Sequence, residues 1–113
     1  MNVVIIDDEH DIGFILGFEL KFAGHTAATF DAIEPAQEHI LSQKVDAIIC
    51  DFQMPKMNGL ELFRWARENN FNGPFYILTG EPTMDKQHLL DVGVSDVLFK
   101  PQDLNRLSEL LKT

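Results

Sequence analysis

Five short apolar runs, separated by segments with helical spacing, constrain the fold of this chain more than any other feature. The clearest runs cover residues 2–6, 46–50, 74–78 and 94–99, and a weaker one covers residues 25–30. Runs of this length, rich in β-branched and aromatic residues, predict buried strands. Apolar residues recur at helical spacing over residues 11–23, 32–43, 59–69, 83–92 and 103–112. The sequence therefore predicts five units of strand followed by helix.

Strands that alternate with helices and are apolar along their length favour a parallel sheet with helices on both faces. We expect an α/β fold of the doubly wound, flavodoxin-like kind, with five strands in the order 2-1-3-4-5. In that order a ligand crevice opens at the carboxyl ends of strands 1 and 3. A chain of 113 residues with 45% apolar content can build one core, so we expect one domain over residues 1–113.

The charge balance limits the partners that this chain can bind. Its 18 acidic and 9 basic residues give a formal net charge of −9, which argues against direct binding to nucleic acid. The lone cysteine, Cys50, lies in an apolar run and is expected to be a buried, reduced thiol. The apolar start of the chain stops at Asp7, far short of a signal peptide or a membrane span. We expect a soluble, cytoplasmic protein that does not enter the membrane.

Charged and hydroxyl residues follow the predicted strands. Asp7 and Asp8 come after the first run, Asp51 after the third, Thr79 after the fourth and Lys100 after the fifth. Neighbouring parallel strands lie about 4.8 Å apart, so the three carboxylates are expected to crowd into one pocket. Lys100 and a hard divalent cation, Mg²⁺ or Mn²⁺, would compensate their repulsion. Zinc is disfavoured because no cysteine or histidine stands at ligand spacing.

Such a pocket suits phosphoryl transfer. A cation beside Asp51 would let this carboxylate attack phosphorus and form an acyl phosphate. Lys100 would then pair with one phosphoryl oxygen, and the Thr79 hydroxyl would donate to another after moving toward the site. Taken singly, the aspartates could be helix caps or turn residues, and Lys100 a solvated loop charge. Their ordered occurrence at the strand ends favours the functional interpretation.

At these residues the sequence resembles the receiver domains of response regulators. The matching segments are IIDDE at 5–9, DFQMPKMNG at 51–59, ILTG at 77–80 and FKP at 99–101, and the match spans nearly the whole chain. The resemblance implies that Asp51 accepts a phosphoryl group from a histidine kinase or a histidine phosphotransferase. A change of affinity for a downstream protein partner would follow, so the chain would be a switch that modifies itself and not a turnover enzyme.

The resemblance also implies roles for the residues around Asp51. Asp7 and Asp8, together with Asp51 and the backbone carbonyl of Gln53, would hold Mg²⁺. Thr79 would sense the phosphoryl group, and Lys100 would clamp it.

Two features depart from the family or stand out within it. Val97 occupies a position, three residues before Lys100, where the family often has an aromatic side chain, so signal output is expected to depend on the loop after Thr79 and on the fourth helix. In the first helix Phe14 and Phe18 project away from the expected inward face. In this family the first helix commonly meets the helical bundle of the phosphodonor, which makes these residues a candidate docking surface. We expect the inward face to consist of Ile12, Ile15, Leu16, Leu20 and Ala23.

Other functions compete with the phospho-acceptor hypothesis. An aspartate-nucleophile phosphatase also uses Mg²⁺ and an acyl phosphate, but its nucleophile normally ends strand 1 in a DxDxT pattern, where this chain has DDEHD. A flavin site would need a phosphate-binding loop after strand 1, which is absent from the sequence. A degenerate receiver that serves only as an interaction module remains open. Met1 at the start of the first run favours a natural amino terminus, and the end at Thr113 fits a stand-alone or a trimmed receiver.

Overall fold

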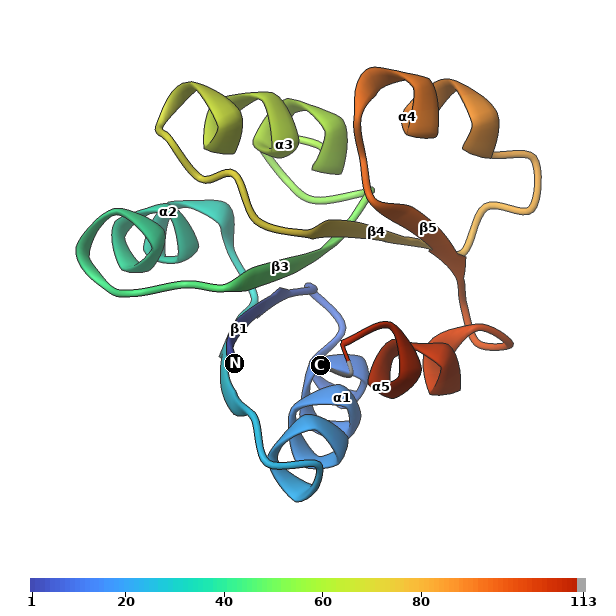
Figure 1. The fold of residues 1–113 in the computed structure, drawn as a ribbon. Coiled ribbons are helices and arrows are strands. Elements are labelled where there is room, and N and C mark those ends of the chain that lie inside the picture. Colours follow the sequence, from blue (N-terminus) through green and yellow to red (C-terminus); the bar gives the residue numbers. More distant parts are fainter. Residues whose placement is uncertain (112–113) are drawn as a thin grey trace.

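The computed structural model describes residues 1–111 and shows a five-stranded parallel sheet between two helical layers (Figure 1). The strands are β1 (Asn2–Ile6), β2 (Thr26–Phe30), β3 (Ala47–Asp51), β4 (Phe75–Thr79) and β5 (Asp96–Phe99). The helices are α1 (His10–Phe22), α2 (Ile33–Ser42), α3 (Gly59–Glu68), α4 (Lys86–Val92) and α5 (Leu107–Leu110), the last preceded by the 3-10 turn η1 (Leu104–Arg106). The strand order is β2-β1-β3-β4-β5, which confirms the predicted flavodoxin-like arrangement.

The predicted element boundaries differ from the observed ones by a few residues. Asp51 and Thr79 are the last residues of β3 and β4, and do not follow them, because strand pairing continues through both. Asp51 pairs with Leu78, and Thr79 with Phe99. The expected helix 83–92 begins only at Lys86, since the side chain of Asp85 accepts a hydrogen bond from the His88 backbone and starts the helix there. The expected helix 103–112 begins as η1, and residue 112 lies outside the described residues.

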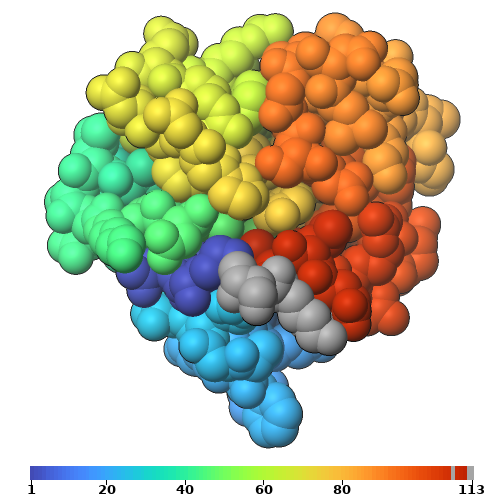
Figure 2. Space-filling model, in the orientation of Figure 1, coloured from blue at the N-terminus to red at the C-terminus, as the bar shows by residue number. Residues whose placement is uncertain are grey.

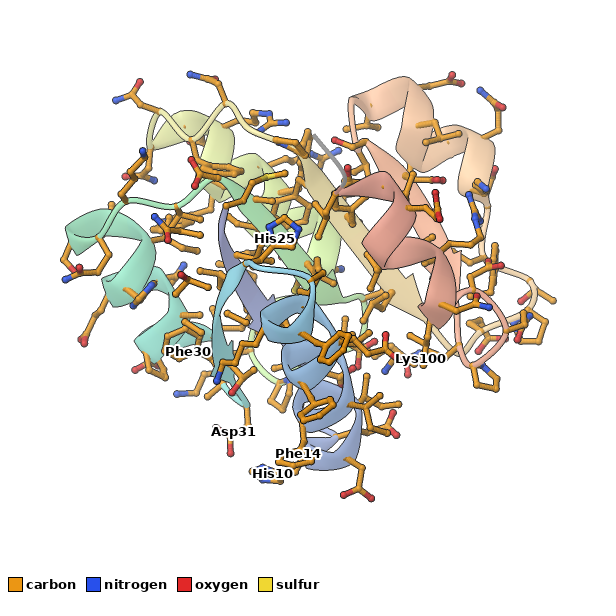
Figure 3. The ribbon with its side chains drawn as sticks, turned by 60° about the horizontal axis from the view of Figure 1, so that its bottom comes forward. His10, Phe14, His25, Phe30, Asp31 and Lys100 are labelled. Atoms are coloured by element: carbon orange, nitrogen blue, oxygen red, sulfur yellow. The ribbon has the colours of Figure 1, made fainter. Side chains whose placement is uncertain are left out.

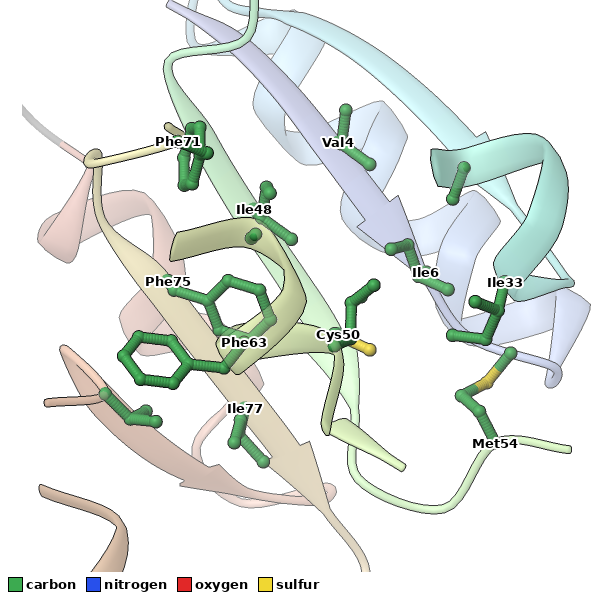
Figure 4. Packing of buried hydrophobic residues seen from close by; sticks show 14 of the residues in the cluster. Val4, Ile6, Ile33, Ile48, Cys50, Met54, Phe63, Phe71, Phe75 and Ile77 are labelled. Atoms are coloured by element: carbon green, nitrogen blue, oxygen red, sulfur yellow. The ribbon is translucent and has the colours of Figure 1, made fainter. Parts of the chain in front are cut away.

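The sheet separates two apolar cores. One core lies under α2, α3 and α4, where Phe63 and Phe75 pack edge to face and Cys50 is fully buried (Figure 4). The other lies under α1 and α5 and is built around Ile5, Ile49 and Leu98. Successive residues of a strand point to opposite faces, so both cores draw on the same strands, which explains why these strands are apolar throughout. The expected burial of Cys50 is confirmed.

Helix α1 is rotated relative to the inward face expected from its apolar residues. Its buried residues are Gly13, Leu16, Gly17 and Leu20, whereas Ile15 is 48% exposed and Ala23 is exposed. A Cβ atom at Gly17 would lie 3.3 Å from the Thr29 methyl group, so glycine lets the helix lie close against β2. Small side chains took inward positions that larger apolar side chains were expected to fill, so the predicted face was wrong for Ile15 and Ala23.

The solvent-facing side of α1 carries a row of aromatic side chains, among them Phe14 and Phe18 as expected from the sequence. Phe14, Phe18 and Phe22 are 75%, 64% and 88% exposed, and with Ile15 they form what we call the α1 stripe. In the space-filling view the end of α1 and the turn after it project at the bottom of the molecule (Figure 2). Within residues 1–111 no helix combines the length and apolarity needed to cross a membrane. The cytoplasmic location stays a prediction.

Candidate functional site

The carboxyl ends of β1 and β3 bring three aspartates together. Ligand oxygens of Asp7, Asp8 and Asp51 all lie within 4.8 Å of one another. Asp7 and Asp51 are buried, at 3% and 6% exposure, whereas Asp8 is exposed to solvent. The sequence expectation that these three residues meet in one pocket is confirmed by their geometry.

Lys100 enters the same pocket from the end of β5. Its ammonium group lies 2.8 Å from Asp7 Oδ2 and 3.4 Å from Asp51 Oδ2, and its side chain is only 9% exposed. The backbone places it there, because the Lys100 N–H donates to the Thr79 carbonyl at 2.8 Å and so continues the pairing of β4 with β5. The Lys100 ammonium therefore pairs with two of the three predicted carboxylates, those of Asp7 and Asp51.

This arrangement perturbs both Asp51 and Lys100. Burial, together with the negative charge of Asp7, raises the pKa of Asp51 to about 6, although Lys100 acts in the opposite direction. Burial by itself lowers the pKa of Lys100, but the close ion pair with Asp7 and the charge of Asp51 outweigh it and raise that pKa overall. The Lys100 ammonium therefore keeps its positive charge. For Asp51, the nearby positive charge does not fully offset the cost of burying the ionised carboxylate.

The orientation of Asp7 leaves one oxygen available to a ligand. Its Oδ1 accepts a hydrogen bond from the Glu9 backbone at 2.8 Å. Its Oδ2 is buried and, among residues 1–111, has the ion pair with Lys100 but no hydrogen bond of good geometry. A buried oxygen in this state, beside two further carboxylates, fits a hard divalent cation with oxygen ligands. The donor set therefore agrees with the Mg²⁺ expected from the sequence.

Thr79 and Gln53 are less closely engaged. Thr79 is 1% exposed at the end of β4, and its hydroxyl oxygen accepts a hydrogen bond from the Glu81 backbone at 3.0 Å. The hydroxyl oxygen is thus held by the loop, and its movement toward a group on Asp51 stays a prediction. Gln53 is exposed two residues beyond Asp51, and the role of its backbone carbonyl stays a prediction.

Sequence reasoning missed two residues beside the pocket. Glu9 Oε1 lies 3.2 Å from Lys100 Nζ, a contact between residues 91 positions apart. The only available signal was that Glu9 directly follows the aspartate pair. His10, to which no role was assigned, lies 3.3 Å from Asp31 at the start of α1 (Figure 3). Both side chains of this pair are exposed, so it contributes little to stability.

A hollow joins the pocket to the α1 stripe. Its volume is about 620 Å³, and its lining includes Asp7, His10, Phe14 and Asp31. Figure 3 shows Phe14 beside His10 on α1, near the end of β2 that carries Asp31. Asp7 of the acidic pocket and Phe14 of the stripe therefore border the same hollow.

Comparison with known proteins places this site in a family. The family model described as "Response regulator receiver domain" matches residues 3–112. The response regulator MprA of Mycobacterium ulcerans is 32% identical over 109 residues, which are 95% of this chain and 47% of that protein. The Regulator of RpoS of Escherichia coli is 33% identical over 97% of this chain and 33% of its own length. The chain thus spans half or less of the length of these relatives.

Solved structures show the same fold. A two-component response regulator from Clostridium difficile aligns with a TM-score of 0.88 at 25% identity, covering 99% of this chain and 93% of that one. The receiver domain of the Francisella response regulator 1452 aligns with a TM-score of 0.80 at 26% identity, covering 98% of both chains.

Proposed function

The chain belongs to the response-regulator receiver family of two-component signalling, and on that premise we propose that Asp51 is its phospho-acceptor. The observation that carries the proposal is the placement of Asp51 within 4.8 Å of the Asp7 and Asp8 oxygens and 3.4 Å from the Lys100 ammonium. No other group of three or more acidic, histidine or cysteine side chains within residues 1–111 is arranged to hold a metal ion.

The reaction transfers a phosphoryl group to an Asp51 oxygen. The carboxylate attacks phosphorus in line with the bond to the donor, which is a phosphohistidine nitrogen or the acyl oxygen of acetyl phosphate. That bond breaks as the new oxygen–phosphorus bond forms, and the donor leaves with the electron pair. Asp51 loses its carboxylate charge because an oxygen lone pair becomes the new bond, and the leaving group takes up the corresponding negative charge. The phosphoryl group brings the negative charge of its own oxygens into the pocket.

The surrounding residues stabilise that charge. Lys100 is already 3.4 Å from Asp51 and pairs with a phosphoryl oxygen, and the Thr79 hydroxyl turns from its loop contact to donate to another. Asp7, Asp8 and Asp51, with the Gln53 carbonyl, would hold Mg²⁺, or Mn²⁺ in its place. When bound, the cation supplies positive charge that offsets the carboxylates and the phosphoryl oxygens.

The direct experiment is incubation with acetyl phosphate and Mg²⁺, followed by intact-mass measurement. Wild-type protein is expected to gain one phosphoryl group, and Asp51→Asn none. Asp31→Asn removes an exposed acid outside the cluster and serves as the matched control, which should be labelled like the wild type. A wild-type protein that gains no phosphoryl group would contradict the proposal and leave an interaction module.

The chain is a substrate of its own phosphorylation and not a turnover catalyst. The alternative hypothesis, that the chain is a phosphatase, predicts steady hydrolysis of a phosphomonoester such as p-nitrophenyl phosphate, with many turnovers per protein molecule. We expect at most a single stoichiometric transfer, measured as release of the leaving group per mole of protein. Sustained release that Asp51→Asn abolishes would favour the phosphatase.

The phosphodonor docks on the α1 stripe. This stripe is the largest group of exposed aromatic side chains among the described residues, and the hollow shared by Phe14 and Asp7 connects it with the acceptor pocket. An amphipathic helical bundle of a histidine kinase or phosphotransferase fits such a surface because aromatic side chains on one helix face can enter its grooves.

Phosphotransfer profiling against a panel of autophosphorylated histidine kinases tests this docking. Phe18→Ala is expected to slow transfer from the preferred kinase about ten-fold or more, the loss typical of a central aromatic contact, while labelling by acetyl phosphate is unchanged. Leu41→Ala is the matched control, because Leu41 on α2 is 62% exposed but distant from the stripe in sequence. Equal rates for Phe18→Ala and wild type would remove the stripe from the docking surface.

A further inference from the structure

Glu9 is the exposed member of the group of carboxylates around Lys100. Its Oε1 lies 3.2 Å from the Lys100 ammonium, compared with 2.8 Å for Asp7 and 3.4 Å for Asp51. Its side chain is 63% exposed, whereas those of Asp7 and Asp51 are at most 8% exposed. Glu9 does not belong to the group of oxygens that could hold a metal ion. Glu9 therefore contacts Lys100 but, unlike Asp7 and Asp51, is not placed to hold a metal ion.

The Glu9 side chain has no capping role that would explain its position. Glu9 is the N-cap residue of α1, but its side chain makes no capping hydrogen bond. The backbone of Glu9 makes the hydrogen bonds at this helix start. Its carbonyl accepts from the N–H groups of Ile12 and Gly13, and its N–H donates to the Asp7 side chain. Within residues 1–111, the Glu9 side chain makes its polar contact with Lys100. Replacement of this carboxylate should therefore leave the fold intact.

Phosphorylation changes the competition for Lys100. Asp51 gives up its carboxylate charge when it becomes an acyl phosphate, and the negative charge of Asp7 is shared with the cation that it binds. Glu9 neither accepts the phosphoryl group nor belongs to the group that could hold the cation, and its carboxylate lies within ion-pair distance of the ammonium. A phosphoryl oxygen must therefore draw Lys100 away from Glu9 in particular.

We propose that Glu9 is a latch that holds Lys100 in the resting state and lowers the affinity of the site for the phosphoryl group. The inference rests on the proposed phospho-acceptor function and adds to it a residue that tunes how readily the switch turns on. Glu9 is a positioning residue, because it acts on the phosphoryl group only through Lys100.

Titration with beryllofluoride, a phosphoryl analogue, in saturating Mg²⁺ tests the latch by isothermal calorimetry. Glu9→Gln is expected to bind the analogue about two- to five-fold more tightly than wild type, the range for loss of one largely exposed ion pair. Asp11→Asn is the matched control, since it removes an exposed negative charge two residues away that has no ion pair with Lys100. Its effect measures the general change in charge, and the Glu9→Gln effect must exceed it.

A second readout uses metal-free protein and needs no analogue. In ¹H–¹⁵N spectra selective for lysine ammonium groups, the Lys100 signal, assigned through Lys100→Arg, should shift and exchange faster with water in Glu9→Gln but not in Asp11→Asn. An unchanged Lys100 signal, or an analogue affinity equal to that of Asp11→Asn or weaker than that of wild type, overturns the latch. Failure of wild-type protein to bind the analogue at all would instead overturn the proposed function, while the ammonium signal would still report the Glu9 contact.

Discussion

At the scale of single residues, Asp51 shows burial and charge acting against each other. Its carboxylate needs to be ionised to attack phosphorus, yet burial and Asp7 raise its pKa to about 6. Lys100 offsets part of that cost without removing it. The ionised side chain is therefore reactive at the expense of folding stability, a balance common at functional sites.

Replacement of Asp51 by asparagine should stabilise the metal-free protein near neutral pH. The folded-state pKa is raised above the ordinary value of 3.8, so ionisation of Asp51 destabilises the fold as pH rises through about 6. We expect Asp51→Asn to raise the free energy of unfolding by about 1–3 kcal/mol at pH 7.5 in EDTA, with the gain fading as pH falls toward 4. Urea unfolding across this pH range measures it.

The control for this prediction is Asp11→Asn, which removes an exposed charge and should change the free energy of unfolding by less than about 0.5 kcal/mol. A gain for Asp51→Asn that stays constant between pH 4 and 7.5 would show that the cause is not ionisation of Asp51.

At the scale of elements, the start of α3 determines how the acceptor strand ends. Gly59 is buried against the backbone that follows β3, where a Cβ atom would lie 3.1 Å from Phe52 Cα and 3.2 Å from the Asp51 carbonyl oxygen. Its N–H donates to the Phe52 carbonyl at 2.8 Å. Asn58 caps the same helix through a reciprocal pair of hydrogen bonds with Glu61. The helix is thus both capped and pressed against the acceptor.

Gly59→Ala should impair both stability and phosphorylation. The added methyl group meets backbone atoms, which yield less easily than side chains, so we expect a loss of about 1–3 kcal/mol in the free energy of unfolding. The same displacement moves Asp51, and the rate of labelling by acetyl phosphate should fall several-fold at equal folded fraction.

Asn58→Ala provides the comparison for Gly59→Ala. Loss of the cap should cost about 0.5–2 kcal/mol of unfolding free energy while leaving the Asp51 backbone in place, so labelling should stay near the wild-type rate. If both variants slowed labelling equally, helix stability and not the close approach of Gly59 would control the acceptor.

At the scale of the whole molecule, the acidic pocket adds local repulsion between carboxylates to a chain whose formal net charge is already −9. The carboxyl ends of β1 and β3 carry clustered carboxylates, with Lys100 as the cation paired with two of them. A bound cation would relieve this local repulsion, and a ligand that binds only the folded state stabilises it by mass action. The chain spans half or less of the length of the relatives named above.

Mg²⁺ should raise the melting temperature of the wild-type protein. At a concentration 100 times the dissociation constant the gain is about 2.7 kcal/mol, which corresponds to a shift of roughly 10 °C for a domain of this size. NaCl at equal ionic strength controls for general screening of the negative charge. Asp8→Asn should show a clearly smaller Mg²⁺ shift in calorimetry, and an identical shift would argue against Asp8 as a ligand.

The sequence by itself determined the parts of this protein that depend on local pattern. Continuous apolar strands between helical segments determined a parallel sheet. Because a parallel sheet brings its carboxyl ends to one edge, the sequence alone predicts that Asp7, Asp8, Asp51 and Lys100 lie together, as they do. The family motifs added their roles, of which the acceptor role of Asp51 stays a prediction to be tested.

Only the tertiary structure decided features that depend on distances between distant segments. The rotation of α1 followed from the fit of Gly17 against Thr29, a contact that helical periodicity does not encode, and it exposed Ile15 where burial was expected. The approach of Glu9 to Lys100 joins residues 91 positions apart. Periodicity reports which side of an element is apolar, whereas packing in three dimensions decides how closely two elements approach and which side chains then meet.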